Sequence, residues 1–161
     1  MVLSHGTGIG SIPISPTKFM IILPYIAAKK AVEEYPNKLN VISISNDNAV
    51  VDPSLCLNHI QIKMDDIDTW HIERFKDELL KKGMIFPEWW HIEAAITFSK
   101  KHKVHIVHCH AGLSRSPAIA YAILRDKGLT KQAALSKVKE IAPESEPNAR
   151  IVKLTDEIYG E

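Results

Sequence analysis

The residues best suited to do chemistry lie in the stretch HCHAGLSRS, residues 108–116. Cys109 ends an apolar run, VHIVHC, that is typical of a buried strand, and five residues separate it from Arg115, where a helix is expected to begin. Backbone N–H groups and the positive end of a helix dipole meet at such a loop, and an arginine can donate two parallel hydrogen bonds. The loop is therefore suited to bind an oxyanion. Because the same donors would stabilise a thiolate, the sequence predicts a cysteine nucleophile beneath a phosphate site.

Three further residues complete the pattern: His108 before the cysteine, Gly112 three positions after it, and Ser116 after the arginine. With them, the stretch resembles the signature loop of the cysteine-dependent protein tyrosine phosphatases, most closely the small dual-specificity-like enzymes, including bacterial ones. The resemblance implies a cysteinyl-phosphate on Cys109 and an Arg115 that holds the phosphate. It also implies a Ser116 hydroxyl that helps the sulfur to leave and a His108 that orients the loop indirectly. Residues 109–115 are called the signature loop below.

The family also implies an aspartic acid that donates a proton from a loop after an upstream strand. Here the strand-like run HIQIKM (59–64) leads into Asp65, Asp66 and Asp68, which are called the acid loop, residues 65–68. Asp66 is the expected acid and the other two remain alternatives. It lies farther upstream than is usual in the family, because residues 70–82 look like an additional helix. The candidate catalytic residues are Cys109, Arg115, Asp66 and Ser116, and the candidate substrate-binding residues are His110, Ala111, Gly112, Leu113 and Ser114.

Two further interpretations of the acidic residues stay open. Asp77 lies nearer to the usual distance from the cysteine, but it belongs to ERFKDELLKK, which is typical of a solvated helix face. The acid loop could also be a charged turn that caps the helix expected near Trp70.

The elements that must position these residues alternate between strand-like and helix-like segments. Strands are expected in residues 19–25, 39–45, 59–64 and 104–109. Helices are expected in residues 27–35, 70–82 and 87–102, from about residue 116, and after the capping residues Thr130 and Asn148. Pro87 is expected in the first turn of its helix. This order predicts an α/β fold with a central mixed, mostly parallel sheet flanked by helices, as in dual-specificity phosphatases.

The length of 161 residues is that of one domain. Residues 19–161 are expected to form a single phosphatase-like catalytic domain. Residues 1–18, rich in Gly, Ser and Pro, are expected to be a flexible arm, whether native or added in cloning. The longest apolar run, residues 19–28, is too short to span a bilayer and is interpreted as a buried strand.

Charge and cysteine content restrict the partners. Twenty Lys and Arg against nineteen Asp and Glu leave a net charge of +1, so no global field would attract nucleic acid or a membrane. Two cysteines suit a reducing, cytoplasmic compartment, and Cys56 is expected to be a buried structural thiol. His108 and Cys109 are neighbours in the expected strand, so their side chains point to opposite faces, and no second Cys/His pair has zinc-site spacing. Neither a metal nor another cofactor is therefore expected. The oligomeric state is not indicated.

The expected substrate is a phosphorylated protein or a small aryl phosphate. The signature loop contains no lysine, whereas relatives that act on phosphoinositides commonly carry basic residues there. A phosphoinositide phosphatase is therefore an alternative, with His110 as the source of partial positive charge. A second alternative is a pseudophosphatase module that binds phosphate without turnover.

Overall fold

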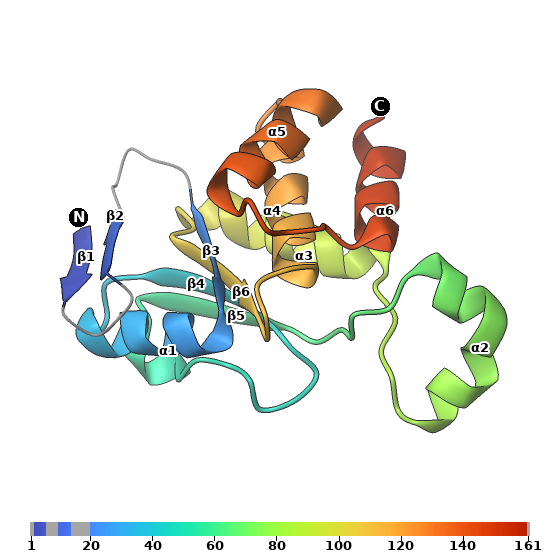
Figure 1. The fold of residues 1–161 in the computed structure, drawn as a ribbon, viewed down its shortest axis with the longest axis horizontal. Helices are drawn as coiled ribbons and strands as arrows, with labels where there is room; N and C mark the ends of the chain where they lie inside the picture. Colours follow the sequence, from blue (N-terminus) through green and yellow to red (C-terminus); the bar gives the residue numbers. More distant parts are fainter. Residues whose placement is uncertain (1, 6–9, 14–19, 161) are drawn as a thin grey trace.

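Strands and helices alternate along the chain and build one parallel sheet between helices (Figure 1). The structure is a computed structural model that describes residues 2–5, 10–13 and 20–160. The strands of the main sheet are β3 (Ile21–Pro24), β4 (Asn40–Ile44), β5 (Asn58–Ile62) and β6 (Ile106–Cys109). The helices are α1 (Tyr25–Glu34), α2 (Thr69–Lys81), α3 (Trp89–Lys101), α4 (Arg115–Asp126), α5 (Lys131–Ile141) and α6 (Ala149–Tyr159), with a short 3-10 helix, η1, at Pro53–Leu55.

The main sheet has the strand order β3-β6-β4-β5, and each neighbouring pair is parallel. The predicted α/β arrangement is confirmed, and this sheet is parallel throughout. β6 is an inner strand whose four residues are all buried, as its apolar sequence predicts. Parallel strands end at the same edge of a sheet, and ligands of open α/β sheets bind outside that edge. Cys109, the last residue of β6, lies at this edge.

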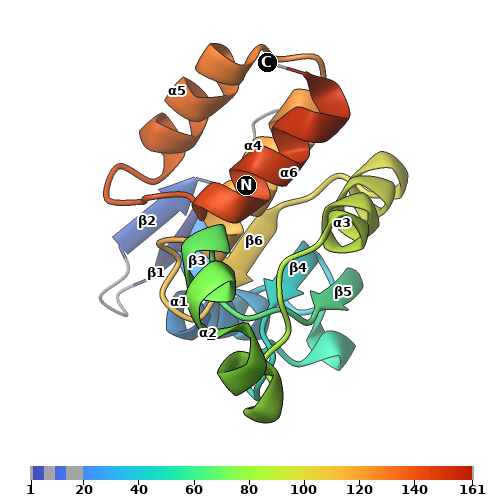
Figure 2. The ribbon, with the colours of Figure 1, turned by 90° about the vertical axis from the view of Figure 1, so that its right-hand side faces the viewer.

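Helices cover both faces of the sheet (Figures 1 and 2). α1 packs on one face against β3 and β6, while α3 and α4 pack on the other face, and α5 and α6 pack on α4. The larger buried core lies between the sheet and α3–α6, and a smaller one lies beneath α1. Every residue of α4 from Ser116 to Arg125 is buried. The first turn of α4, which follows the signature loop, is therefore firmly held.

Side chains mark several helix ends as the sequence predicts. Thr130 accepts a hydrogen bond from the Ala133 N–H at the start of α5, and Asn148 accepts one from the Ile151 N–H at the start of α6. The placement of Pro87 in a first helical turn is wrong, because α3 begins at Trp89 with a capping box between Glu88 and His91. Trp89 and Trp90 are both half exposed, and neither belongs to the buried core.

The expected additional helix is present as α2, but it has no buried residue. It projects away from the sheet and its covering helices (Figure 1). Its backbone leaves helical geometry at Phe75, a kink that the sequence does not predict. The Arg74 guanidinium lies 4.3 Å from the centre of the Trp70 ring, so the helix makes some of its contacts within itself.

Near the N-terminus, β1 (Val2–His5) and β2 (Gly10–Pro13) pair antiparallel in a small sheet of their own. The other residues of the arm expected at 1–18 lie outside the described ranges, and the flexibility of that arm stays a prediction. No helix in the described part of the chain is long and apolar enough to cross a membrane.

Candidate active site

The Cys109 side chain lies at the base of the signature loop and is only 2% exposed. Its Sγ atom is 3.1 Å from the Ser116 Oγ, and it accepts a hydrogen bond from the Gly112 N–H at 3.2 Å. The strand end supplies the sulfur, the loop supplies the backbone donor, and the first turn of α4 supplies the hydroxyl. This arrangement can stabilise negative charge on the sulfur.

Gly112 is required by the backbone of the loop. Its φ is +74°, a conformation that favours glycine. A Cβ atom built there would lie 2.8 Å from the Pro24 nitrogen and 2.9 Å from the Leu23 carbonyl carbon. The missing side chain therefore lets the loop approach the end of β3. The His110 carbonyl accepts a hydrogen bond from the Tyr25 N–H, which fixes the loop to the start of α1.

His108 lies beneath the loop and is completely buried. Its Nδ1 atom is 3.1 Å from the Cys109 carbonyl oxygen. Because a carbonyl can only accept, the ring donates this hydrogen bond. Burial lowers the pKa of His108 to about 4, although the bond to the carbonyl opposes the shift. The imidazole is therefore neutral near pH 7 and its contact with the loop is to the backbone; the indirect role that the family resemblance implies for it stays a prediction.

Arg115 connects the signature loop with the segment before the acid loop. It is the first residue of α4, and its Nη1 donates a hydrogen bond to the Met64 carbonyl at 2.9 Å. This side chain is half-buried, and a cation at a helix N-terminus is unfavourable unless an anion is near. Asp47 in the turn after β4 is one such anion. Its pKa is lowered by hydrogen bonds from Ser45 and Ala49, and to a smaller extent by the charges of His110 and Arg115.

Asp66 is the acid-loop residue that the structure brings to the signature loop. Its Oδ1 accepts hydrogen bonds from the Ser114 hydroxyl at 2.7 Å and from the Asn148 side-chain amide at 2.9 Å. Asp66 itself is exposed, so its carboxyl group can reach a ligand. Ser114 is the residue before α4, where a serine often caps the helix, but here its hydroxyl bonds to Asp66 instead.

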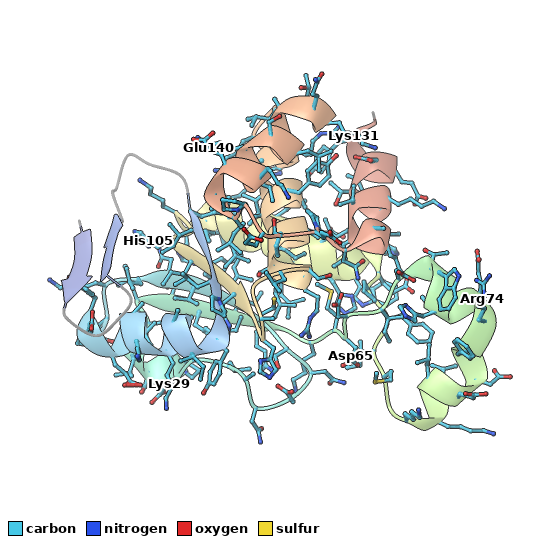
Figure 3. All side chains as sticks on the ribbon, viewed as in Figure 1. Lys29, Asp65, Arg74, His105, Lys131 and Glu140 are labelled. Atoms are coloured by element: carbon cyan, nitrogen blue, oxygen red, sulfur yellow. The ribbon has the colours of Figure 1, made fainter. Side chains whose placement is uncertain are left out.

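The other acidic candidates have structural partners elsewhere. Asp65 accepts hydrogen bonds from the Ile85 N–H at 2.7 Å and the Asn46 amide at 2.9 Å, so it closes the loop that carries α2. Asp68 caps α2 through the His71 N–H, as the capping interpretation predicts for this residue. Asp77 lies on the exposed surface of α2. Figure 3 shows Asp65 between the sheet and α2, with Arg74 farther out on that helix.

Asn148 is a site residue that the sequence identifies only as a helix cap. Its Oδ1 caps α6, while its Nδ2 donates to both Asp66 Oδ1 and the Ile67 carbonyl. Its backbone N–H donates to the Ser114 carbonyl. One buried asparagine thus joins α6, the acid loop and the signature loop. The contacts with the acid loop span more than eighty positions of sequence, and no local pattern could have indicated them.

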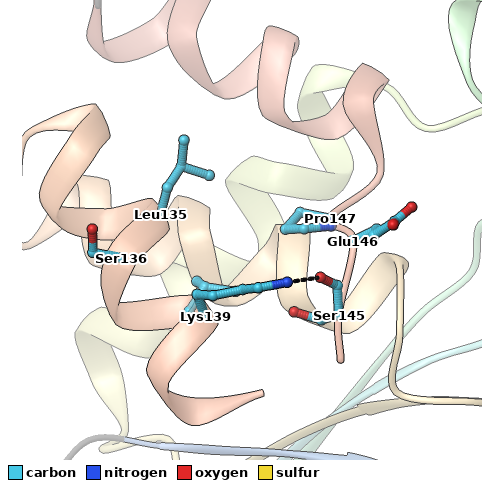
Figure 4. Close-up of a pocket in the computed structure, with 7 residues that line it drawn as sticks. Leu135, Ser136, Lys139, Ser145, Glu146 and Pro147 are labelled. Carbon is cyan, nitrogen blue, oxygen red and sulfur yellow. Dashed lines mark hydrogen bonds between the residues drawn. The ribbon is translucent and has the colours of Figure 1, made fainter. Parts of the chain in front are cut away.

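The remaining loop residues form the rim of the site. His110, Ala111 and Leu113 are exposed, and the Leu113 carbonyl accepts a hydrogen bond from the Glu146 N–H. A groove of about 500 Å³, which Glu146 helps to line, lies between α5 and residues 145–147 (Figure 4). In it, the Lys139 ammonium donates to the Ser145 carbonyl at 3.3 Å.

Neither Cys56 nor a metal cluster extends the site. Cys56 is buried in the small core beneath α1, and burial raises its pKa to about 11, as expected of a structural thiol. Among the residues that the structure describes, no three His, Cys, Asp or Glu side chains are arranged to hold a metal ion.

Comparison with known proteins rests on structure alone. No protein-family model matches the chain, and no curated protein sequence matches it. DUSP15 is similar to it with a TM-score of 0.63 and 21% identity, over 92% of this chain and 86% of that one. PTP-2 phosphatase of Cydia pomonella has a TM-score of 0.59 and 18% identity, over 89% and 88%. PTPMT1, in a complex with PI(5)P, has a TM-score of 0.58 and 13% identity, over 87% and 86%. The chain has the fold of the cysteine-dependent protein tyrosine phosphatases, in the small form of the dual-specificity enzymes.

Proposed function

We propose that this protein hydrolyses phosphate monoesters, namely phosphotyrosine, or phosphotyrosine together with phosphoserine and phosphothreonine, in proteins. The observation that carries the proposal is the position of the Cys109 sulfur. It is held by the Ser116 hydroxyl and the Gly112 N–H, directly before a helix that begins with Arg115. A nucleophile within an anion-binding loop is what attack on a phosphoryl group requires. The exposed Asp66 beside that loop supplies a group that can carry a proton.

In the first step, the Cys109 thiolate attacks phosphorus and the bond from phosphorus to the substrate oxygen breaks. Asp66, as a carboxylic acid, gives its proton to the departing oxygen, while Arg115 and the loop N–H groups bind the phosphoryl oxygens. In the second step, water attacks phosphorus and Asp66, now a carboxylate, takes a proton from it. The sulfur–phosphorus bond breaks, the Ser116 hydroxyl donates to the departing sulfur, and phosphate leaves.

The test is hydrolysis of p-nitrophenyl phosphate with and without vanadate. We expect metal-independent turnover that vanadate inhibits and that Cys109→Ser abolishes while vanadate still binds to the loop. Cys56→Ser is the matched control, because this thiol is also buried but lies in the other core, and it should retain activity. Activity that survives Cys109→Ser and is lost with a chelator would overturn the proposal. Vanadate binding without turnover in the wild type would instead indicate a pseudophosphatase module.

A phosphoinositide phosphatase is the second candidate, since the chain shares its fold with PTPMT1, which was crystallised with PI(5)P. The absence of lysine from the signature loop and the nearby Asp47 carboxylate favour a protein substrate over a lipid with several phosphates. We expect a higher kcat/KM for a phosphotyrosyl peptide than for PI(5)P in vesicles. The reverse order would make the lipid the substrate.

A further inference from the structure

A line of three side chains crosses the sheet behind the signature loop. Ser43 Oγ in β4 lies 2.6 Å from His108 Nε2 in β6 and 2.8 Å from His59 Nε2 in β5. Ser43 and His108 are paired in the register of their strands, so their side chains leave the sheet side by side. The line continues through the His108 ring to the Cys109 carbonyl oxygen, 3.1 Å from Nδ1.

Each hydrogen bond in this line has one possible direction when both imidazoles are neutral. The Cys109 carbonyl only accepts, so His108 carries its proton on Nδ1 and its Nε2 is an acceptor. Ser43 must then donate its hydroxyl proton to His108 Nε2. Having used that proton, Ser43 Oγ accepts from His59, which therefore carries its own proton on Nε2.

Burial supports the neutral state of both rings. Ser43 and His108 are completely buried, and His59 is half-buried in the edge strand of the sheet. Burial lowers the pKa of His108 and also that of His59. A neutral imidazole has two tautomers, and the partners at its two nitrogens select between them; in His108 the Cys109 carbonyl at Nδ1 and the Ser43 hydroxyl at Nε2 both favour the Nδ1–H form.

We infer that Ser43 and His59 are positioning residues that hold His108 in its Nδ1–H tautomer and thereby fix the Cys109 carbonyl at the start of the signature loop. The inference rests on the proposed phosphatase function for its effect on turnover. If the tautomer were reversed, the Nδ1 lone pair would face the lone pairs of the carbonyl oxygen. The Cys109 peptide would then be released or turned, and the loop N–H that donates to the sulfur would move with it.

The first experiment reads the tautomers directly. The ¹⁵N chemical shifts of the ring nitrogens at pH 7.5 should show the Nδ1–H form for His108 and the Nε2–H form for His59. In Ser43→Ala, His108 should populate the Nε2–H form. An Nε2–H tautomer of His108 in the wild type would overturn the inference, and so would an unchanged tautomer in Ser43→Ala.

The second experiment measures the rate at which iodoacetamide alkylates Cys109 at pH 7, resolved by mass spectrometry, together with kcat/KM. Loss of a buried hydrogen bond should lower both by about tenfold in Ser43→Ala and by several-fold in His59→Leu. His59→Gln keeps an N–H donor near the position of Nε2 and should restore both values to within about twofold of the wild type, which a merely structural role would not require.

His105→Leu is the matched control. His105 is also half-buried, directly before β6, and its ring accepts one hydrogen bond, from the Asn40 N–H at 3.0 Å, but it has no bond to Ser43 or the loop. It should lose stability while keeping the alkylation rate. Equal losses in His105→Leu and His59→Leu, or no rescue by His59→Gln, would overturn the inference. A wild type without turnover would refute the proposed function, whereas alkylation and tautomers would still decide the role of Ser43 and His59.

Discussion

At the scale of single residues, Arg115 binds one group in the structure, the Met64 carbonyl, and in the proposed mechanism it also binds the phosphoryl group of the substrate. Its Nη1 donates to the Met64 carbonyl, directly before the acid loop, and its backbone begins α4, one residue before the Ser116 whose hydroxyl lies beside the Cys109 sulfur. A planar guanidinium has five N–H donors, so it can hold a backbone carbonyl and a phosphoryl group together. Lysine offers the same charge from a single atom. The proposed mechanism therefore requires arginine for its shape as much as for its charge.

Arg115→Lys should lower kcat/KM for p-nitrophenyl phosphate by about 100-fold or more, because it removes the paired donors and the Met64 contact. Arg150→Lys is a suitable control. Arg150 also holds a carbonyl, that of Pro87, and pairs with Glu88, but it lies on α6 outside the signature loop. The control should cost stability and little activity. Near-normal kcat/KM in Arg115→Lys would show that this arginine is an ordinary helix-surface charge.

At the scale of elements, the acid loop is fixed at both ends while its central carboxylate stays exposed. Asp65 accepts a hydrogen bond from the Ile85 N–H and so joins the two ends of the segment that carries α2. Asp68 caps the N-terminus of α2. Between them, Asp66 reaches across to Ser114 and Asn148. The three neighbouring aspartates therefore divide between two structural roles and one role at the site.

Asp66→Asn should slow hydrolysis of phosphotyrosine strongly, because a leaving oxygen whose conjugate acid has a pKa near 10 needs a proton in the transition state. An aryl phosphate with an acidic phenol should be affected much less in the phosphorylation step. The mutation should also remove the basic limb of the kcat/KM pH profile. Kinetics with a series of aryl phosphates of graded leaving-group pKa would measure this dependence.

Asp65→Asn and Asp68→Asn are the controls for Asp66→Asn, and the two should differ from each other in their effect on stability. Asp65→Asn should lower stability, since Asp65 accepts a backbone N–H inside the protein. Asp68→Asn should change little, because asparagine caps helices nearly as well as aspartate. If one of these two shows the leaving-group dependence and Asp66→Asn does not, the acid has been assigned to the wrong residue. If none shows it, Asp77 or another group donates the proton.

Patterns of neighbouring residues could predict the strands, helices and caps, but not the contacts between segments that are distant in the sequence. The strand before Cys109, the glycine in the loop, and the caps Thr130 and Asn148 follow from neighbouring residues. The bonds from Arg115 to Met64 and from Asn148 to Asp66 join segments that only the folded chain brings together. The kink at Phe75 was also unpredictable, because α2 buries none of its residues, so burial does not constrain its sequence pattern.

At the scale of the whole molecule, the helical layer is joined by a buried polar network. Asp156 of α6 accepts hydrogen bonds from Tyr121 and from Arg125, both on the central helix α4, and it also pairs with Lys131 of α5. The Arg125 and Asp156 side chains are only 5% and 6% exposed. The pKa of Tyr121 is raised by burial and by its bond to Asp156, so the phenol remains a donor. This network joins the three helices that follow the signature loop.

Asp156→Ala should lower the free energy of unfolding by about 3–5 kcal/mol, because it leaves the Arg125 charge buried without its partner. For a domain of this size, that corresponds to a fall in Tm of roughly ten degrees. Glu140→Ala, which removes an exposed ion pair with Lys137 on α5, should change stability by less than about 0.5 kcal/mol. Thermal unfolding followed by circular dichroism would compare the two, and equal effects would contradict the buried-charge explanation.

The folded protein should also become less stable on mild acidification. Burial lowers the pKa values of four histidines, His59, His91, His105 and His108, from their ordinary value near 6.5, and that of His108 falls to about 4. Below about pH 6.5 these histidines bind protons in the unfolded chain but stay neutral in the folded protein. Their contribution to the free energy of unfolding is therefore present above that pH and is lost progressively down to about pH 4.

Urea unfolding at pH 7.5, 6.5 and 5.5 would measure this loss. His108 alone should lower the free energy of unfolding by about 1 kcal/mol between pH 6.5 and 5.5. A group that binds its proton only in the unfolded chain contributes up to about 1.4 kcal/mol per pH unit. The lowered pKa values of the exposed Asp47 and Asp52 carboxylates act only below about pH 4, so this window isolates the histidines. His105→Asn keeps an acceptor for the Asn40 N–H but cannot titrate, and it should reduce the slope. A free energy of unfolding that stays constant from pH 7.5 to 5.5 would mean that these rings take up protons without unfolding the protein.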